Sequence, residues 1–273
     1  MIKSDVMSCI KLCQRQNFSV AKVLSVLLVY LCHLFENFNN SFQFIVVSVF
    51  FFVSGFGVEF GGLRMRSLLR LPRYIAAFFF FSFLYYLVYG VWFFPSAWFL
   101  LAYFMLMVLY RFFSGNFILF FISYFILGYF YYFLDFSFSY YVTPFGFVYG
   151  VYVARYMRMF RWLHSLLLAF CGFFVFFTYQ PLFFIFFIPL YLRLFLTLCT
   201  ARSISYFSYP VNLVYPFFMG HCFVLGFFGV TWTLGGSYDF YASLLAFVCS
   251  VLFAYVLYRF VPFFSKRKFW IFQ

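Results

Sequence analysis

The sequence predicts an all-α membrane protein, a polytopic integral membrane bundle of about ten transmembrane helices with both termini in the cytoplasm. Three observations predict this class. Hydrophobic residues make up 68% of the 273 residues and charged residues 8%, whereas soluble domains carry about 25% charged residues. Apolar runs close to the twenty or so residues that a membrane crossing needs recur along the chain. The basic residues gather in alternate loops, as expected of cytoplasmic loops.

Short polar or basic turns separate the expected helices. Residues 1–18 form an amphipathic lead-in on the cytoplasmic surface, residues 19–262 form a single transmembrane domain, and residues 263–273 form a basic cytoplasmic tail. The apolar runs place helices at 19–36, 42–62, 74–94, 97–113, 116–134, 140–154, 163–178, 182–201, 204–229 and 240–262. The loops between these helices are too short for a separate soluble domain.

Net charge and cysteine content bear on partners and cofactors. A net charge of +13 would indicate nucleic-acid binding in a soluble protein. Here the positive-inside rule accounts for it, and no nucleic-acid partner is expected. The seven cysteines contain no CxxC pair and fall within or beside apolar runs, which is typical of small core residues. No grouping of His, Cys, Asp and Glu has zinc-site spacing, so no metal is predicted.

Ionisable residues on the first expected helix indicate a functional site. Lys22 and His33 are eleven positions apart, about three helical turns, and therefore share one face. An ionisable side chain inside a spanning helix is a functional-site hypothesis. His33 is interpreted as a general base or, alternatively, as a histidine hydrogen-bonded to a neighbouring helix. Glu36, one turn further on, either orients the imidazole, binds sugar hydroxyls or is a solvated interfacial acid. Lys22 is also explained as an interfacial anchor.

Three segments in this order resemble a known family. They are Lys22 and His33 with ten residues between them, FFFVSGFG around Ser54 and Gly55, and the basic loop RSLLRLPRY. Together they resemble the membrane-bound acyltransferase-3 family of carbohydrate O-acyltransferases, and SAWFLLAYF and TPFGFVYG resemble further segments of it. The resemblance implies transfer of an acyl group, most often acetyl, from cytoplasmic acyl-CoA to a hydroxyl of a glycan or lipid-linked saccharide. It also implies the cytoplasmic membrane of a microbe, and a role in O-acetylation of polysaccharide.

The resemblance also implies roles for individual residues. His33 would be the general base, with Glu36 beside it. Coenzyme A carries phosphate groups, which guanidinium forks bind in a bidentate manner. The residues expected to bind this co-substrate are Lys22, Arg64, Arg66, Arg70 and Arg73. The alternative for the arginines is topology determination or contact with anionic membrane lipid.

The segment YFSYPVNLVYPF departs from the family pattern. Asn212 stands where the family has tyrosine and Tyr215 stands where it has histidine. Both side chains can hydrogen-bond a substrate, but neither replaces an imidazole base. His221, about two turns further along, either substitutes in part or packs in the core. Ser54 is expected to serve helix packing first and substrate contact second.

Small residues and one acid predict helix contacts. Gly55 lets a helix or ligand approach closely, and Gly146 and Gly150 form a small-xxx-small face for close helix packing. Glu59, near the inner end of the second expected helix, is expected to pair with Arg64 or Arg66.

Two other functions remain open from the sequence. The first is a non-enzymatic hydrophobic subunit of an organelle-encoded respiratory or ATP-synthase complex in the mitochondrial inner membrane, which would share the apolar composition and short loops. The second is a degenerate acyltransferase that acts as a scaffold or flippase, which the residues at Asn212 and Tyr215 would allow. Against the first, the sequence shows neither the paired histidines of haem-carrying subunits nor the several intramembrane acids or lysines that a proton path uses.

Overall fold

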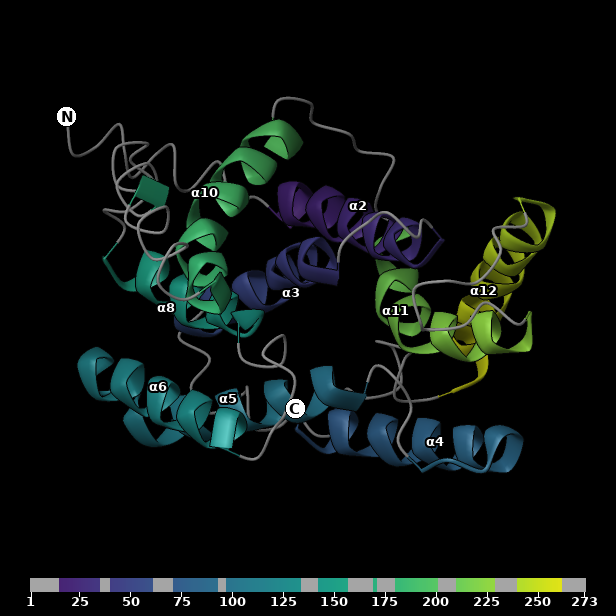
Figure 1. Ribbon diagram of the computed structural model, residues 1–273, viewed down its shortest axis with the longest axis horizontal. Coiled ribbons are helices and arrows are strands. Elements are labelled where there is room, and N and C mark those ends of the chain that lie inside the picture. The colour runs from purple at the N-terminus through teal and green to yellow at the C-terminus, as the bar shows by residue number, and fades with distance from the viewer. Residues whose placement is uncertain are drawn as a thin grey trace.

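The computed structural model is all-helical in the part of the chain that it describes, which confirms the all-α class (Figure 1). The described residues are 15–34, 40–60, 71–92, 97–133, 142–156, 169–170, 180–200, 210–228 and 240–261. The helices are α2 (Arg15–Leu34), α3 (Asn40–Phe60), α4 (Leu71–Tyr89), α5 (Ala97–Phe113), α6 (Phe117–Phe133), α8 (Phe145–Tyr156), α10 (Gln180–Thr200), α11 (Pro210–Phe227) and α12 (Phe240–Phe260).

The observed helix ends differ from the expected ones by a few residues. Helix α2 begins at Arg15, inside the segment expected to be a lead-in, and α4 ends at Tyr89 rather than at residue 94. Gly90 follows with a φ of 70°, a left-handed conformation that terminates helices. The helix expected at 163–178 falls almost wholly outside the described residues.

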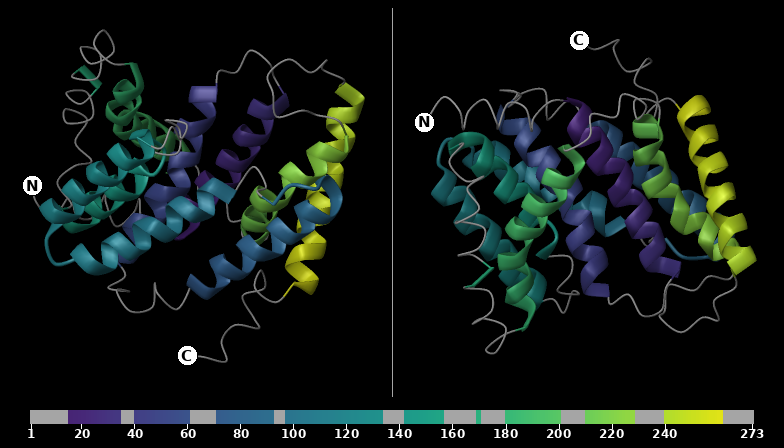
Figure 2. Two further views of the ribbon diagram at one scale, coloured as in Figure 1. Left: turned by 60° about the horizontal axis from the view of Figure 1, so that its bottom comes forward. Right: turned by 90° about the horizontal axis from the view of Figure 1, so that it is seen from above.

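The described helices lie in groups around a central pair (Figure 1). Helices α2 and α3 lie near the centre, α8 and α10 on one side of them and α11 and α12 on the other, while α4, α5 and α6 run along one edge. Figure 2 shows the same groups from two further directions. The core is apolar and rich in aromatic rings, and includes the fully buried side chains of Tyr30, Phe52, Tyr110 and Phe147.

Contacts along the helices fix their relative directions. Helices α3 and α8 run parallel, because Ser48 meets Gly146 and, further along both helices, Glu59 meets Arg155. Helix α5 is also parallel to α3, whereas α6 is antiparallel to α8. On the other side of the molecule, α2 and α4 both run parallel to α11.

Glycines bring α3 and α8 into backbone contact. A Cβ atom added at Gly146 or Gly150 would overlap the main-chain oxygen of Ser48 or Phe52 on α3. A Cβ atom added at Gly55 would likewise overlap the backbone of α8. The predicted small-xxx-small contact is therefore confirmed, and its partner is the helix that carries the Ser54–Gly55 pair.

Large apolar side chains cover much of the outer surface. On α4, α6 and α12 these include Phe79, Leu87, Ile118, Tyr129 and Leu252, each more than half exposed. By length and composition, one stretch of the described residues, Tyr241–Phe260 in α12, could cross a membrane. The other apolar helical stretches among them are 10–17 residues long.

Candidate functional site

Two histidines from distant parts of the chain meet between α2 and α11. The ring of His33, one residue before the end of α2, lies 5.3 Å from that of His221 on α11, centre to centre, with the planes inclined by 41°. His33 is partly buried, while His221 is 2% exposed. Because α2 and α11 run parallel, successive turns of one helix pack against successive turns of the other, and the turns that carry His33 and His221 are in contact. The sequence placed both residues in the site, but not against each other.

The hydrogen bonds of His221 determine which of its nitrogens can accept a proton. Its Nδ1 lies 2.8 Å from the carbonyl oxygen of Phe218 and 3.2 Å from that of Phe217. Carbonyl oxygens only accept, so Nδ1 donates the hydrogen. In a neutral imidazole this leaves Nε2 with its lone pair. The thiol of Cys222 lies 3.5 Å from Nε2.

Aromatic side chains enclose the His221 ring. Phe217 stacks on it with ring centres 5.8 Å apart, and Tyr30 packs edge-on at 6.3 Å. The Tyr30 hydroxyl donates to the carbonyl oxygen of Ser243, 3.0 Å away, and so joins α2 to α12. His221 is therefore held rigidly, and His33 is the more accessible member of the pair.

The structure places the other expected substrate residues away from this pair. Asn212 and Tyr215 lie about 13 and 9 Å from His221 along α11, at 1.5 Å of rise per residue. Tyr215 packs against Tyr74 of α4, with ring centres 5.8 Å apart. Ser54 is partly buried on α3, next to the glycine that contacts α8. Asn212, Tyr215 and Ser54 were expected in one site with the histidines, but they do not lie beside the two rings.

The expected coenzyme-A residues are described only in part. Lys22 is partly buried on α2, about 16 Å along the helix from His33. Arg73 lies in the first turn of α4, but only its backbone is described. Glu36, Arg64, Arg66 and Arg70 lie outside the described residues.

A second polar cluster joins the ends of α3, α5 and α8. The Nε and Nη2 atoms of Arg155 each donate to one oxygen of Glu59, at 2.9 Å. The hydroxyl of Tyr110 donates to the same carboxylate, and Nη2 also donates to the carbonyl oxygen of Ser114 at 2.7 Å. The two charged side chains are only 17% and 12% exposed. A fork of this kind satisfies charges that would be costly to bury alone.

Among the described residues, the partner of Glu59 is Arg155; Arg64 and Arg66, which the sequence analysis named as partners, lie outside the described residues. The physical reason is that α3 and α8 run parallel, which brings their last turns together across 96 positions of sequence. The sequence does show that Glu59 and Arg155 are both ionisable residues near the end of an apolar helix. Only the direction of the helices in space identifies them as partners.

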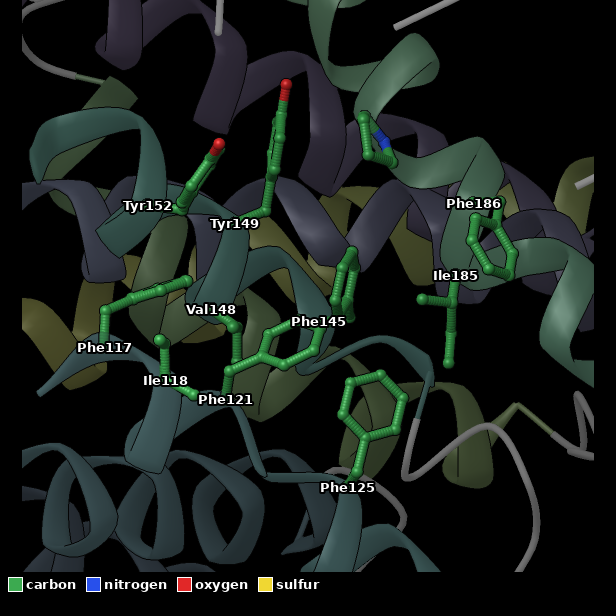
Figure 3. A pocket seen from close by; sticks show the side chains of 11 residues that line it. Phe117, Ile118, Phe121, Phe125, Phe145, Val148, Tyr149, Tyr152, Ile185 and Phe186 are labelled. Atoms are coloured by element: carbon green, nitrogen blue, oxygen red, sulfur yellow. The ribbon is translucent and has the colours of Figure 1, made fainter. Parts of the chain in front are cut away.

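A cavity of about 440 Å³ lies between α6, α8 and α10. It is lined by Phe117, Ile118, Phe121, Phe125, Phe145, Val148, Tyr149, Tyr152, Ile185, Phe186 and Pro189 (Figure 3). None of these residues belongs to α2 or α11, so the cavity is separate from the histidine pair. Among the residues that the structure describes, no three His, Cys, Asp or Glu side chains are grouped to hold a metal ion.

Comparison with known proteins identifies no relative of this chain. No protein-family model, curated protein sequence or solved structure matches this chain. The site is therefore interpreted from its own geometry.

Proposed function

We propose that this chain is an integral membrane O-acyltransferase that moves an acyl group, most often acetyl, from acyl-CoA to a hydroxyl of a glycan or lipid-linked saccharide. The observation that carries the proposal is the pairing of His33 with His221 inside an apolar bundle. Ionisable side chains in such surroundings are costly and are usually functional. Two imidazoles in contact can accept a proton and hold it next to a second acceptor.

His33 is the base in this proposal. As the acceptor oxygen bonds to the thioester carbonyl carbon, its proton moves to an imidazole nitrogen of His33. The carbon–sulfur bond then breaks, and the thiolate of coenzyme A takes the proton from the imidazolium. His221 presents the lone pair of Nε2, because Nδ1 donates to main-chain carbonyl groups. It therefore positions His33 and steadies the proton during transfer.

The helix directions support a membrane topology of ten spans with both termini on the cytoplasmic side. In that topology α2, α4, α6 and α11 run outward, while α3, α5 and α8 run inward. The parallel packing of α2 and α4 with α11, and of α5 and α8 with α3, agrees with this assignment. The antiparallel packing of α6 on α8 agrees as well.

The same topology places the two substrates on opposite sides. Lys22 and the loop with Arg64, Arg66, Arg70 and Arg73 face the cytoplasm, where acyl-CoA is made. His33 lies toward the outer leaflet, near the end of α2. The acyl group therefore has to reach into the bundle from the inner side, and the acceptor hydroxyl meets it from the outer side. The membrane in this proposal is the cytoplasmic membrane of a microbe.

Transfer of radiolabelled acetyl from acetyl-CoA in isolated membranes tests this function. The wild type is compared with His33→Ala and Arg70→Ala, with each variant's level in the membrane measured alongside. We expect incorporation by the wild type, a loss of at least about 100-fold in His33→Ala because a general base is removed, and a raised KM for acetyl-CoA in Arg70→Ala. Equal incorporation in all three would refute the catalytic assignment.

A further inference from the structure

The cavity between α6, α8 and α10 has walls of one chemical character. Figure 3 shows phenyl rings and aliphatic side chains directed into it from the three helices. Only Tyr149 and Tyr152 carry polar atoms on their side chains, and their hydroxyl oxygens point to the opposite side from Phe121 and Phe125 (Figure 3). Apolar cavities exclude water and take up hydrocarbon. A volume of about 440 Å³ is within the range of ligand sites in proteins.

One face of α8 changes in polarity from one end of the cavity to the other. Val148, Tyr152 and Arg155 follow one another at spacings of four and three residues, so they lie on the same face of the helix. The face therefore passes from an aliphatic group to a phenol and then to a guanidinium. This is the polarity order of a lipid that lies with its chain along α8 and its head at the C-terminal end of that helix.

Arg155 stands at the end of the cavity where such a head would lie. Its guanidinium carbon is 5.9 Å from the ring centre of Phe117, a residue of the cavity wall. Glu59 and the carbonyl of Ser114 hold Nε and Nη2. Nη1 donates no hydrogen bond to any of the residues described here. Its two N–H groups suit a phosphate oxygen.

We propose that this cavity binds a phosphate-bearing membrane lipid, with one hydrocarbon chain between α6, α8 and α10 and the phosphate on Nη1 of Arg155. The site goes beyond the proposed transferase function and is independent of the acyl transfer, although it rests on the membrane topology of that proposal. In the topology proposed above, Arg155 lies at the cytoplasmic interface, where anionic phospholipid is concentrated. The lipid closes an opening in the bundle and joins α6, α8 and α10 through one ligand.

Native mass spectrometry of the full chain, purified in a neutral detergent and stripped of lipid, tests the site. The probes are phosphatidylglycerol, a diacylglycerol with the same two chains, and inorganic phosphate. We expect an adduct with phosphatidylglycerol, binding of diacylglycerol that is weaker by about tenfold because the charged hydrogen bond is missing, and no adduct with phosphate alone. Equal binding of both lipids, or binding of phosphate alone, would overturn the proposal.

Two pairs of variants locate the lipid. Ile118→Trp fills the cavity from a residue that is already 66% exposed, whereas Leu119→Trp adds the same bulk beside it, outside the lining. Arg155→Gln removes the guanidinium group that would donate hydrogen bonds to the phosphate. Arg259→Gln removes an exposed arginine from α12 and serves as its control. We expect phosphatidylglycerol binding to fall about tenfold in the first member of each pair and to stay unchanged in the second.

The two pairs also allow the result to be interpreted if one variant fails to fold. Ile118→Trp changes a surface position, so it remains informative even where Arg155→Gln, which also breaks the ion pair with Glu59, fails to fold. If Ile118→Trp and Leu119→Trp bind phosphatidylglycerol equally, the lipid is not in this cavity. Because the readout is lipid retention, loss of acetyl transfer in any other experiment leaves the result unaffected.

Discussion

The centres of the imidazole rings of His33 on α2 and His221 on α11 lie 5.3 Å apart, although the two residues are 188 positions apart in the sequence. The two helices belong to opposite ends of the chain and run parallel. The two rings differ in how they are held. His221 is fixed by hydrogen bonds to two main-chain carbonyl groups and by stacking on Phe217. His33 is the ring that remains partly open to its surroundings.

This pairing predicts unequal effects of the three histidines on acetyl transfer. His33→Gln is expected to lower the rate at least about 100-fold, because the base is lost. His221→Gln is expected to lower it about tenfold, through misplacement of His33 and loss of the second acceptor. The measurement is the rate of transfer from labelled acetyl-CoA, normalised to protein in the membrane. His164, the third histidine of the sequence, lies outside the described residues. His164→Gln serves as the control and is expected to match the wild type; a loss as large as that of His33→Gln would contradict the assignment.

The contact between α3 and α8 predicts opposite results at two nearby glycines. Gly55→Ala places a methyl group on the main-chain oxygen of Phe147, so we expect a loss of about 2 kcal/mol in unfolding free energy. Gly57→Ala meets nothing within 4 Å and gains about 1 kcal/mol of helix propensity. Thermal unfolding of both variants in detergent compares them directly. Equal melting temperatures would show that the backbone contact is absent.

The ion pair at the C-terminal ends of α3 and α8 predicts energetic coupling. Glu59→Gln and Arg155→Gln are each expected to cost about 2 kcal/mol, because the remaining partner is left partly buried without its opposite charge. The double variant is expected to cost less than the sum of the two. A double-mutant cycle on unfolding free energy measures the coupling, and strict additivity would rule out a direct interaction.

The hydrogen bond from Tyr30 to Ser243 predicts a smaller, specific effect. Tyr30→Phe keeps the ring and removes only the donor that joins α2 to α12, so the expected loss is about 1 kcal/mol. That corresponds to a fall of about 2–4 °C in Tm for a protein of this size. Tyr129→Phe, at a residue that is 68% exposed on α6, is the matched control. A fall of the same size in the control would remove the support for the bond.

Sequence patterns predicted the helices well where composition changes sharply. Helix α5 spans Ala97–Phe113, as expected, because Pro95 and Ser96 precede it and Ser114 and Gly115 follow it. Helix α11 is described from Pro210, a residue that suits the first turn of a helix, while the residues from 204 to 209 that were expected in the same helix lie outside the described part of the chain. The glycine contacts of α8 were also predictable, because residues four apart share one face.

The arrangement of the site could not be predicted in the same way. His221 meets His33, and Arg155 meets Glu59, across long stretches of sequence. Periodicity states which face of a helix is apolar but not which helix covers that face. The directions expected for the helices allowed both pairs, but which of the parallel helices pack together is determined by their side-chain contacts. The cavity likewise depends on three helices that share no motif.

The backbone contact between α3 and α8 has a consequence for how the protein is made. Ribosomes make α3 well before α8, and α4, α5 and α6 lie between them in the chain. Until then, the face of α3 around Gly55 lacks the helix that covers it in the folded protein, since α8 does not yet exist. Contacts of such long sequence separation form late. Truncated chains that end before α8 should therefore be recognised as incomplete and degraded, whereas chains that include it should persist.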